Sequence, residues 1–305
     1  MAGLKAIKGK IRSIEKTRKV TKAMEAVSAA KMRKAQIAAI GARTYARAAV
    51  SVLARTEGSG ALARHALTST RPIRAALYIV ITSDKGLAGN LNGGVLKAAY
   101  ADIKLVGLLP EQVAIIAVGR KANDFFSKRG FSIAAYHENA DEKITGEMID
   151  VLVREAGYRF SLGAVDVVKV AYQNFISTFE QRPTVRIVLP LSLSELSRVV
   201  ADIVPAKGKF ADTALIKTAA SPHSVEPSPE EILNELTHKL IGVFVYHALL
   251  ENKASEHSAR MVAMKSASDK AGERSKELTR AFNKARQAAI TREVSEIIGG
   301  IEAMV

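Results

Sequence analysis

The distribution of proline along the chain constrains its fold more than any other feature. All eight prolines, at positions 72, 110, 183, 190, 205, 222, 227 and 229, lie between Arg71 and Glu230. Because proline disrupts helix interiors, the proline-free stretches at the two ends can form long helices. The second stretch opens with Ser228, Pro229 and Glu230, which suit the N-cap, the first helical position and the positive end of a helix. We therefore predict one helix over residues 1–58 and another over residues 230–305.

Small or apolar residues recur along the C-terminal stretch at alternating intervals of four and three. These positions are Leu236, Leu240, Val243, His247, Leu250, Ala254, His257, Met261, Met264, Ser268, Ala271, Ser275, Leu278, Phe282, Ala285 and Ala289. Such spacing is the heptad seam of a coiled coil. The N-terminal stretch has the same period at Leu4, Ile7, Ile11 and Ile14, and then at Met24 and Val27. We predict that the two helices form a long antiparallel coiled coil, which is slender where the seam is small, from Ser268 to Ser275.

Between the two helices, short apolar runs alternate with amphipathic stretches, which indicates an α/β head domain with a Rossmann-like sheet. The predicted strands are Ala75–Thr82, Val113–Val118, Phe131–Tyr136, Val165–Ala171 and Val185–Pro190. The predicted helices are Gly94–Val106, Lys121–Lys128 and Glu147–Phe160, with a looser return over Arg198–Ser228. The predicted divisions are therefore a helix over 1–58, the head over 72–205, a connection over 206–229 and a helix over 230–305.

Charge and composition narrow the classes of function. Of the net charge of +15, almost all comes from residues 1–74, where 17 Lys/Arg stand against three acidic residues. This excess predicts an acidic partner for the N-terminal helix. The chain has no cysteine, which excludes disulfides, thiolate metal sites and thiol nucleophiles. It has no run of about 18 apolar residues and no signal-like N-terminus, so we expect peripheral membrane association and a cytoplasmic location.

No motif in the sequence predicts catalysis, a metal or a cofactor. The glycine-containing segment Ser83–Gly94 follows a strand, but it matches neither of the two phosphate-binding glycine patterns, so we interpret it as a structural turn. The six histidines include no pair at the spacing that would aim two of them at one ion. No metallohydrolase or serine-hydrolase motif is present.

Two alternative functions remain open at this stage. The basic N-terminal helix could belong to a coiled-coil adaptor or a nucleic-acid-associated protein, because lysines and arginines neutralise phosphates. Against nucleic acid, the first 44 residues contain no Tyr, Phe or Trp on which bases could stack. A nucleotide-dependent enzyme that uses the α/β domain is the other alternative.

Three segments, in order along the chain, carry a family resemblance. They are Ile11–Glu25 with Ala30–Ala35, Ser83–Leu87, and Glu251–Lys265 with Asn283–Thr291. Together they resemble the gamma subunit of F-type ATP synthases of the bacterial type. One departure is Lys85, at a position where arginine is common in that family.

The resemblance implies a set of partners and a non-catalytic role. The coiled coil would be a central-stalk shaft inside a hexamer of three alpha and three beta subunits. The head would sit beside the epsilon subunit on the c-ring of the membrane sector. Proton flow would turn the ring and the shaft, while ATP is made on the beta subunits. The implied location is the cytoplasmic face of a bacterial plasma (inner) membrane, with the membrane reached only through the c-ring.

The resemblance also implies which residues touch the hexamer. Contacts with the beta subunits would come from two stretches of the N-terminal helix and one of the C-terminal helix: Lys22, Met24, Arg33, Lys34, Arg286, Gln287 and Thr291. The apolar C-terminal end would occupy a bearing formed by the hexamer, through Ile297, Ile298, Ile301 and Met304. No catalytic residue, metal or cofactor is implied.

Overall fold

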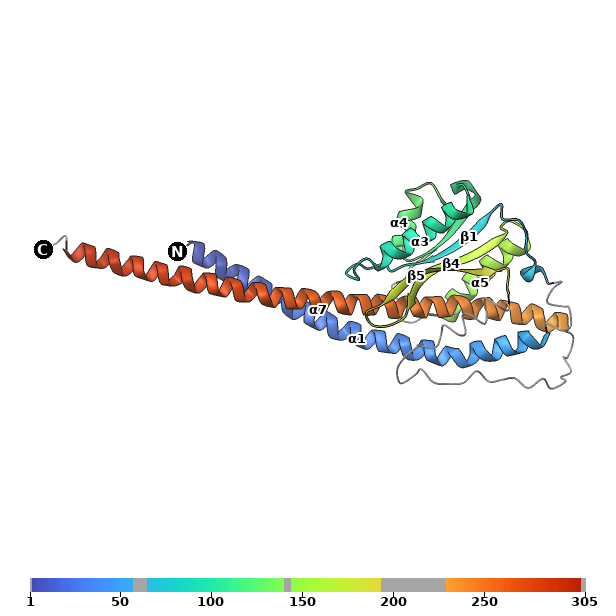
Figure 1. Cartoon of the computed structure of the whole chain (residues 1–305), viewed down its shortest axis with the longest axis horizontal. Coiled ribbons are helices and arrows are strands. Elements are labelled where there is room, and N and C mark those ends of the chain that lie inside the picture. The colour runs from blue at the N-terminus through green and yellow to red at the C-terminus, as the bar shows by residue number, and fades with distance from the viewer. Residues whose placement is uncertain (1, 57–64, 140–143, 193–228, 303–305) are drawn as a thin grey trace. The chain divides into compact units, whose positions relative to one another are not determined.

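The computed structural model describes residues 2–56, 65–139, 144–192 and 229–302 (Figure 1). The chain forms two compact units, one of residues 1–29 with 260–305 and the other of residues 30–259. The boundary between these units therefore crosses both terminal helices, α1 (Ala2–Thr56) and α7 (Pro229–Glu302). The predicted division placed its boundaries at the ends of these helices. The predicted return helix Arg198–Ser228 lies outside the described residues.

The first unit is an antiparallel two-helix coiled coil, as predicted. Figure 1 shows the N-terminal end of α1 and the C-terminal end of α7 at the same end of this unit, with α7 continuing past α1. Along α7, Met264, Ser268 and Ser275 are buried, and the other predicted seam positions up to Ala289 are half-buried. Residues between these positions are mostly exposed. The four-three spacing therefore identifies the packed face of α7.

The seam of α1 differs from the prediction at one place. Leu4, Ile7, Ile11 and Ile14 are half-buried, as expected for the seam. Val27, however, is 53% exposed, while its neighbour Ser28 is buried at 3% and Thr21 at 8%. The placement of Val27 on the seam was therefore wrong. Small polar residues thus take the buried positions in this part of α1.

Gly272 lies within the segment of α7 that was predicted to be slender. A Cβ atom at this position would lie 3.3 Å from Nε of Arg18 on α1. The absence of a side chain thus allows the Arg18 side chain to lie directly against the backbone of α7.

The second unit contains a five-stranded mixed sheet in the order β3-β2-β1-β4-β5. The strands are β1 (Ala76–Ile81), β2 (Val113–Val118), β3 (Ser132–His137), β4 (Val167–Phe175) and β5 (Gln181–Leu189). The first four are parallel, and β5 pairs antiparallel with β4. All five predicted strands are present. The prediction ended β4 early and began β5 late. Strand β5 contains Pro183, which is tolerated because β5 is an edge strand.

Helices cover both faces of this sheet. The α-helices are α3 (Leu91–Val106), α4 (Arg120–Ser127) and α5 (Gly146–Ser161), close to the predicted bounds; short 3-10 turns are η2 (Ala66–Thr68) and η3 (Pro110–Gln112). Alternate residues of β1 enter two cores: Tyr78 packs with α3 and α4, while Ile79 packs with α5 and α7. Figure 1 shows α3 and α4 on one side of the sheet and α5 and α7 on the other. The middle of α7 is therefore part of the head as well as of the coil.

Candidate partner-binding surface

The outer face of α1 in the coiled-coil unit is strongly basic. Its exposed cationic side chains are Lys5, Lys8, Lys10, Arg12, Lys16, Arg18, Lys19 and Lys22. On the same segment, Glu15 is exposed and Glu25 is half-buried, so positive charge dominates this face. The seam residues are turned inward, which leaves the lysines and arginines free to face a partner with acidic groups.

The predicted contact residues of the coil are accessible. Lys22, Arg286, Gln287 and Thr291 are exposed, and Met24 is half-buried beside the seam. The Thr291 hydroxyl donates to the carbonyl of Gln287 at 3.0 Å, so these two residues support each other within one turn of α7. Accessibility is what a contact surface requires.

The structure separates these residues into two patches. Since Arg18 contacts Gly272, Lys22 and Met24 lie four and six residues along α1 in one direction. Arg286 lies fourteen residues beyond Gly272 on the antiparallel helix, in the opposite direction. At a rise of about 1.5 Å per residue, the two patches are about 30 Å apart along the coil. Arg33 and Lys34 are exposed in the other unit.

The last turns of α7 carry an apolar stripe. Ile297 is 63% exposed and Ile298 is 53% exposed, both at predicted bearing positions. The side chain of Ile301 and the whole of Met304 lie outside the part of the chain that the structure describes. Two residues that the sequence analysis missed, Ile290 and Val294, belong to the same exposed stripe. Their spacing of four, then three to Ile297, continues the helical period and could have identified them.

The turn after β1 is built around Asp84. One carboxylate oxygen of Asp84 accepts from the backbone N–H of Arg120, at the start of α4, at 2.7 Å. The other oxygen accepts from the backbone N–H of Asn139 at 2.7 Å. The amide of Asn139 in turn donates to the carbonyl of Thr82 at 2.6 Å. Asp84 thus joins the carboxyl ends of β1, β2 and β3.

This arrangement is consistent with a structural turn and argues against a phosphate site. Ligands of open α/β sheets bind at the carboxyl ends of the strands, often at backbone N–H groups of a helix N-terminus. Here the backbone N–H group at the start of α4 already donates a hydrogen bond to the Asp84 carboxylate. A fixed negative charge at that place repels a phosphate group.

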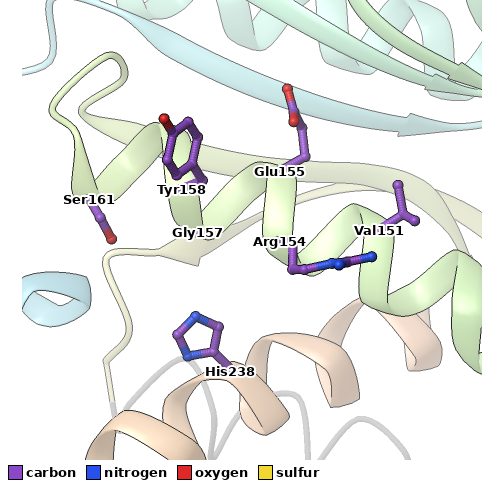
Figure 2. Close-up of a pocket in the computed structure, with 7 residues that line it drawn as sticks. All are labelled: Val151, Arg154, Glu155, Gly157, Tyr158, Ser161 and His238. Carbon is purple, nitrogen blue, oxygen red and sulfur yellow. The ribbon is translucent and has the colours of Figure 1, made fainter.

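A groove of about 600 Å³ lies between α5 and the first turns of α7 (Figure 2). His238 of α7 points toward α5, where Gly157 leaves room for it; a Cβ there would be 3.8 Å from His238 Nε2. Glu155 and Tyr158 project away from His238, and Glu155 pairs with Arg159 at 2.5 Å. Glu155 and Tyr158 therefore do not approach His238 within the groove.

The described residues show neither a metal site nor a membrane-spanning helix. Within the described ranges, no three His, Asp or Glu side chains converge as metal ligands would. None of the helices that the structure describes combines the length and the apolar character needed to cross a membrane.

An α/β domain built onto a two-helix coiled coil, with a basic face and an exposed apolar end, defines a class of protein that works through contacts with other chains. A family model described as ATP synthase matches residues 3–304. The ATP synthase gamma chains of Heliobacterium modesticaldum and Legionella pneumophila (strain Paris) are 39% and 37% identical to this chain, each covering 100% of both chains. The chain belongs to the family of ATP synthase gamma chains, the central-stalk rotor subunits of that enzyme.

Solved structures agree on the fold. A chain of the Euglena gracilis mitochondrial ATP synthase, in a structure of OSCP, F1 and the c-ring, matches with a TM-score of 0.63 and 21% identity, covering 99% of this chain and 95% of that one. A chain of the Tetrahymena thermophila mitochondrial central stalk and c-ring matches with a TM-score of 0.59 and 23% identity, covering 82% and 99%. At these identities the likeness concerns the fold alone.

Proposed function

We propose that this chain transmits rotation of a membrane-embedded c-ring to a catalytic hexamer of three alpha and three beta subunits, and so couples proton translocation to ATP synthesis. The observation that carries the proposal is the unpaired end of α7. Ile290, Val294, Ile297 and Ile298 form an exposed apolar stripe beyond the packed seam. An exposed apolar stripe of this kind marks a surface that contacts another protein.

The basic face suits a shaft that turns against an acidic stator. Exposed ion pairs contribute about 0–1 kcal/mol each, because water screens them and long side chains lose entropy. Contacts of this strength can favour one angle of the shaft without fixing it there. Each catalytic site would then be a two-state element that the asymmetric shaft biases in turn.

We assign the roles along the shaft as follows. One patch, at Lys22 and Met24, and a second, at Arg286, Gln287 and Thr291, contact beta subunits at different heights. Arg33 and Lys34 extend the basic surface on α1. The apolar stripe of α7, with Ile301 and Met304, forms the bearing contact with the hexamer.

The head has a different set of partners in this proposal. It sits on the c-ring beside the epsilon subunit, so the chain reaches the cytoplasmic face of a bacterial inner membrane indirectly. The chain is non-catalytic and needs no cofactor of its own. The Asp84 turn is consistent with this view, because its carboxylate accepts a hydrogen bond from the backbone N–H group at the start of α4.

The direct test is reconstitution of the complex. The purified chain is mixed with alpha and beta subunits from the same source, and the stoichiometry and ATPase activity are measured. We expect one copy per three alpha and three beta subunits, with ATPase activity that the chain alone lacks. Failure to associate, with salt-sensitive binding to nucleic acid instead, would favour the basic adaptor. Intrinsic ATPase activity of the isolated chain would favour the nucleotide-dependent enzyme.

A second test addresses the bearing. Ile297→Ser combined with Ile298→Ser should weaken association with the hexamer while leaving the unfolding of the chain unchanged, because both side chains are exposed in the isolated chain. The matched control is Glu293→Gln, an exposed polar residue on the same segment of α7. Equal affinities of the control and the double variant would contradict the bearing role.

A further inference from the structure

A short segment of α7 buries an unusual number of polar side chains. Glu251, Asn252, Lys253, Ser255, Glu256 and Ser258 are all at most 7% exposed. Burial of a polar group is unfavourable unless the group is hydrogen-bonded. The hydrogen-bond partners of these side chains therefore indicate the role of the segment.

Three of these side chains bind the backbone of β4. Asn252 Oδ1 accepts from the backbone N–H of Gln173 at 3.2 Å, and Glu251 Oε2 accepts from that of Phe175 at 2.8 Å. The Ser255 hydroxyl donates to the carbonyl of Gln173 at 3.2 Å. Pairing of β1 with β4 ends at Val80 and Ala171, so no β1 residue is available to this part of β4. Helix side chains take the place of a neighbouring strand.

Two further contacts extend the attachment on both sides. The Ser258 hydroxyl donates to the carbonyl of Thr178, in the turn between β4 and β5, at 2.6 Å. The Lys253 ammonium donates to the carbonyl of Asn139 at 2.6 Å. Asn139 is the residue that Asp84 holds against the ends of the strands. We call Glu251, Asn252, Lys253, Ser255 and Ser258 the polar belt.

The polar belt adds directional contacts to the apolar contacts between α7 and the sheet, which have no preferred direction. Hydrophobic attraction has no preferred direction, so apolar faces can slide over each other at little cost. Hydrogen bonds require both a distance and an angle. From Glu251 to Ser258 the belt spans seven residues, about 10 Å of helix axis, so it opposes both rotation of α7 about its axis and sliding along it.

We propose that the polar belt is the joint through which torque passes between the head and α7. The inference rests on the proposed rotor function and adds the place where the head and the shaft are locked together. The seam residues Leu250, Ala254 and His257 occupy a neighbouring face of the same turns of α7. One stretch of helix thus carries both the coiled-coil contact and the joint.

The experiment uses the assembled enzyme in sealed membrane vesicles, with ATP hydrolysis and ATP-driven proton pumping measured on the same sample. The test variant combines Glu251→Ala, Asn252→Ala and Ser258→Ala. We expect normal assembly and near-normal hydrolysis, with a pumping-to-hydrolysis ratio reduced several-fold. Hydrogen exchange at the amides of Gln173 and Phe175 should be roughly tenfold faster, as the loss of a hydrogen bond of ordinary strength predicts.

Two controls separate the joint from a general loss of stability. Ile241→Val removes one methyl group from the apolar contact of α7 with the sheet and leaves the belt intact. Glu273→Gln changes an exposed residue of α7 away from the belt. Both controls should keep the wild-type ratio of pumping to hydrolysis. A milder belt variant, Asn252→Ser, can be compared with Ile241→Val at a matched thermal midpoint.

The possible outcomes are distinct. If exchange at Gln173 and Phe175 accelerates but the ratio does not change, the belt is not the joint. The same holds if Ile241→Val lowers the ratio as much as a belt variant of equal thermal midpoint. If vesicles assembled without this chain pump as well as complete ones, the rotor function itself fails.

Discussion

The interior of the coiled-coil unit differs greatly from the interior of the sheet unit. In the sheet unit, β1 is buried along its whole length, and separate cores lie on its two faces. In the coiled-coil unit, most seam residues are only half-buried, and several of the buried ones are small or polar, such as Thr21, Ser28 and Ser268. The sheet unit is therefore stabilised by its own core, whereas the coil leaves much of its surface to partners.

Truncation of one apolar side chain in the interior of each unit tests this contrast most strongly. Ile79→Ala, in the sheet core, should lower the free energy of unfolding by about 3–4 kcal/mol, because a cavity remains. Ile11→Ala, at a half-buried seam position, should cost about 1 kcal/mol. Denaturant unfolding of the purified chain measures both. Equal losses would mean that the coil has a core as tight as that of the sheet.

Addition of a methyl group to one glycine in each unit gives the next largest difference. Gly119 has φ of +95°, and a Cβ atom there would lie 2.2 Å from the carbonyl oxygen of Thr82. Gly119→Ala should therefore cost about 3 kcal/mol. Gly272→Ala meets only the flexible Arg18 side chain and gains helix propensity, so its net effect should lie within about 1 kcal/mol of zero. Thermal unfolding distinguishes the two, and a large loss at Gly272 would show that the coil cannot separate slightly.

A charge at the surface of the coil should affect coupling more than stability. Met24→Lys alters a half-buried side chain beside the seam, so the free energy of unfolding should fall by no more than about 1 kcal/mol. We expect the enzyme to assemble and hydrolyse ATP, with impaired ATP-driven proton pumping, because a new charge lies at a packed contact. Normal pumping at a normal rate of hydrolysis would contradict a role for Met24 in contact with the hexamer.

The smallest expected effect is a pH dependence confined to the sheet unit. Partial burial by itself raises the pKa of the Asp166 carboxyl. The backbone N–H groups of Arg74 and Ala75, which donate to this carboxyl at 2.8 and 3.0 Å, outweigh that effect and lower the pKa. A carboxyl with a lowered folded pKa stabilises the fold fully above its unfolded value of about 4, and this stabilisation is lost as pH falls through the folded value. Asp166→Asn should therefore flatten the decline of thermal midpoint below about pH 4.

The control for this prediction is Asp269→Asn, in the exposed part of the coil. Thermal midpoints of the wild type and both variants are compared at pH 3 and pH 6. If Asp269→Asn flattens the acid limb as much as Asp166→Asn does, the hydrogen bonds to Asp166 are not the cause.

The sequence predicted whatever depends on local periodicity. The seam of α7 and the five strands follow from spacing alone, because each position repeats the environment of its neighbours. Val27 was misplaced because apolar character was favoured, whereas the structure buries the neighbouring Ser28. The polar belt could not be predicted, since its partners on β4 lie more than 70 residues away along the chain. The predicted contact residues rest on resemblance alone, whereas Ile290 and Val294 could have been identified from their helical spacing.

The position of α7 against the sheet has a consequence for how the chain is made. One face of the sheet is closed by Leu240, Ile241, Phe244, Val245, Ala248 and Leu249. During synthesis, every strand leaves the ribosome before this segment does, so the apolar face of the sheet is uncovered while the last quarter of the chain is translated. Chains that terminate early keep that face exposed and are substrates for chaperones or proteases. The core of the head is therefore completed only late in translation, once residues 240–249 have been synthesised.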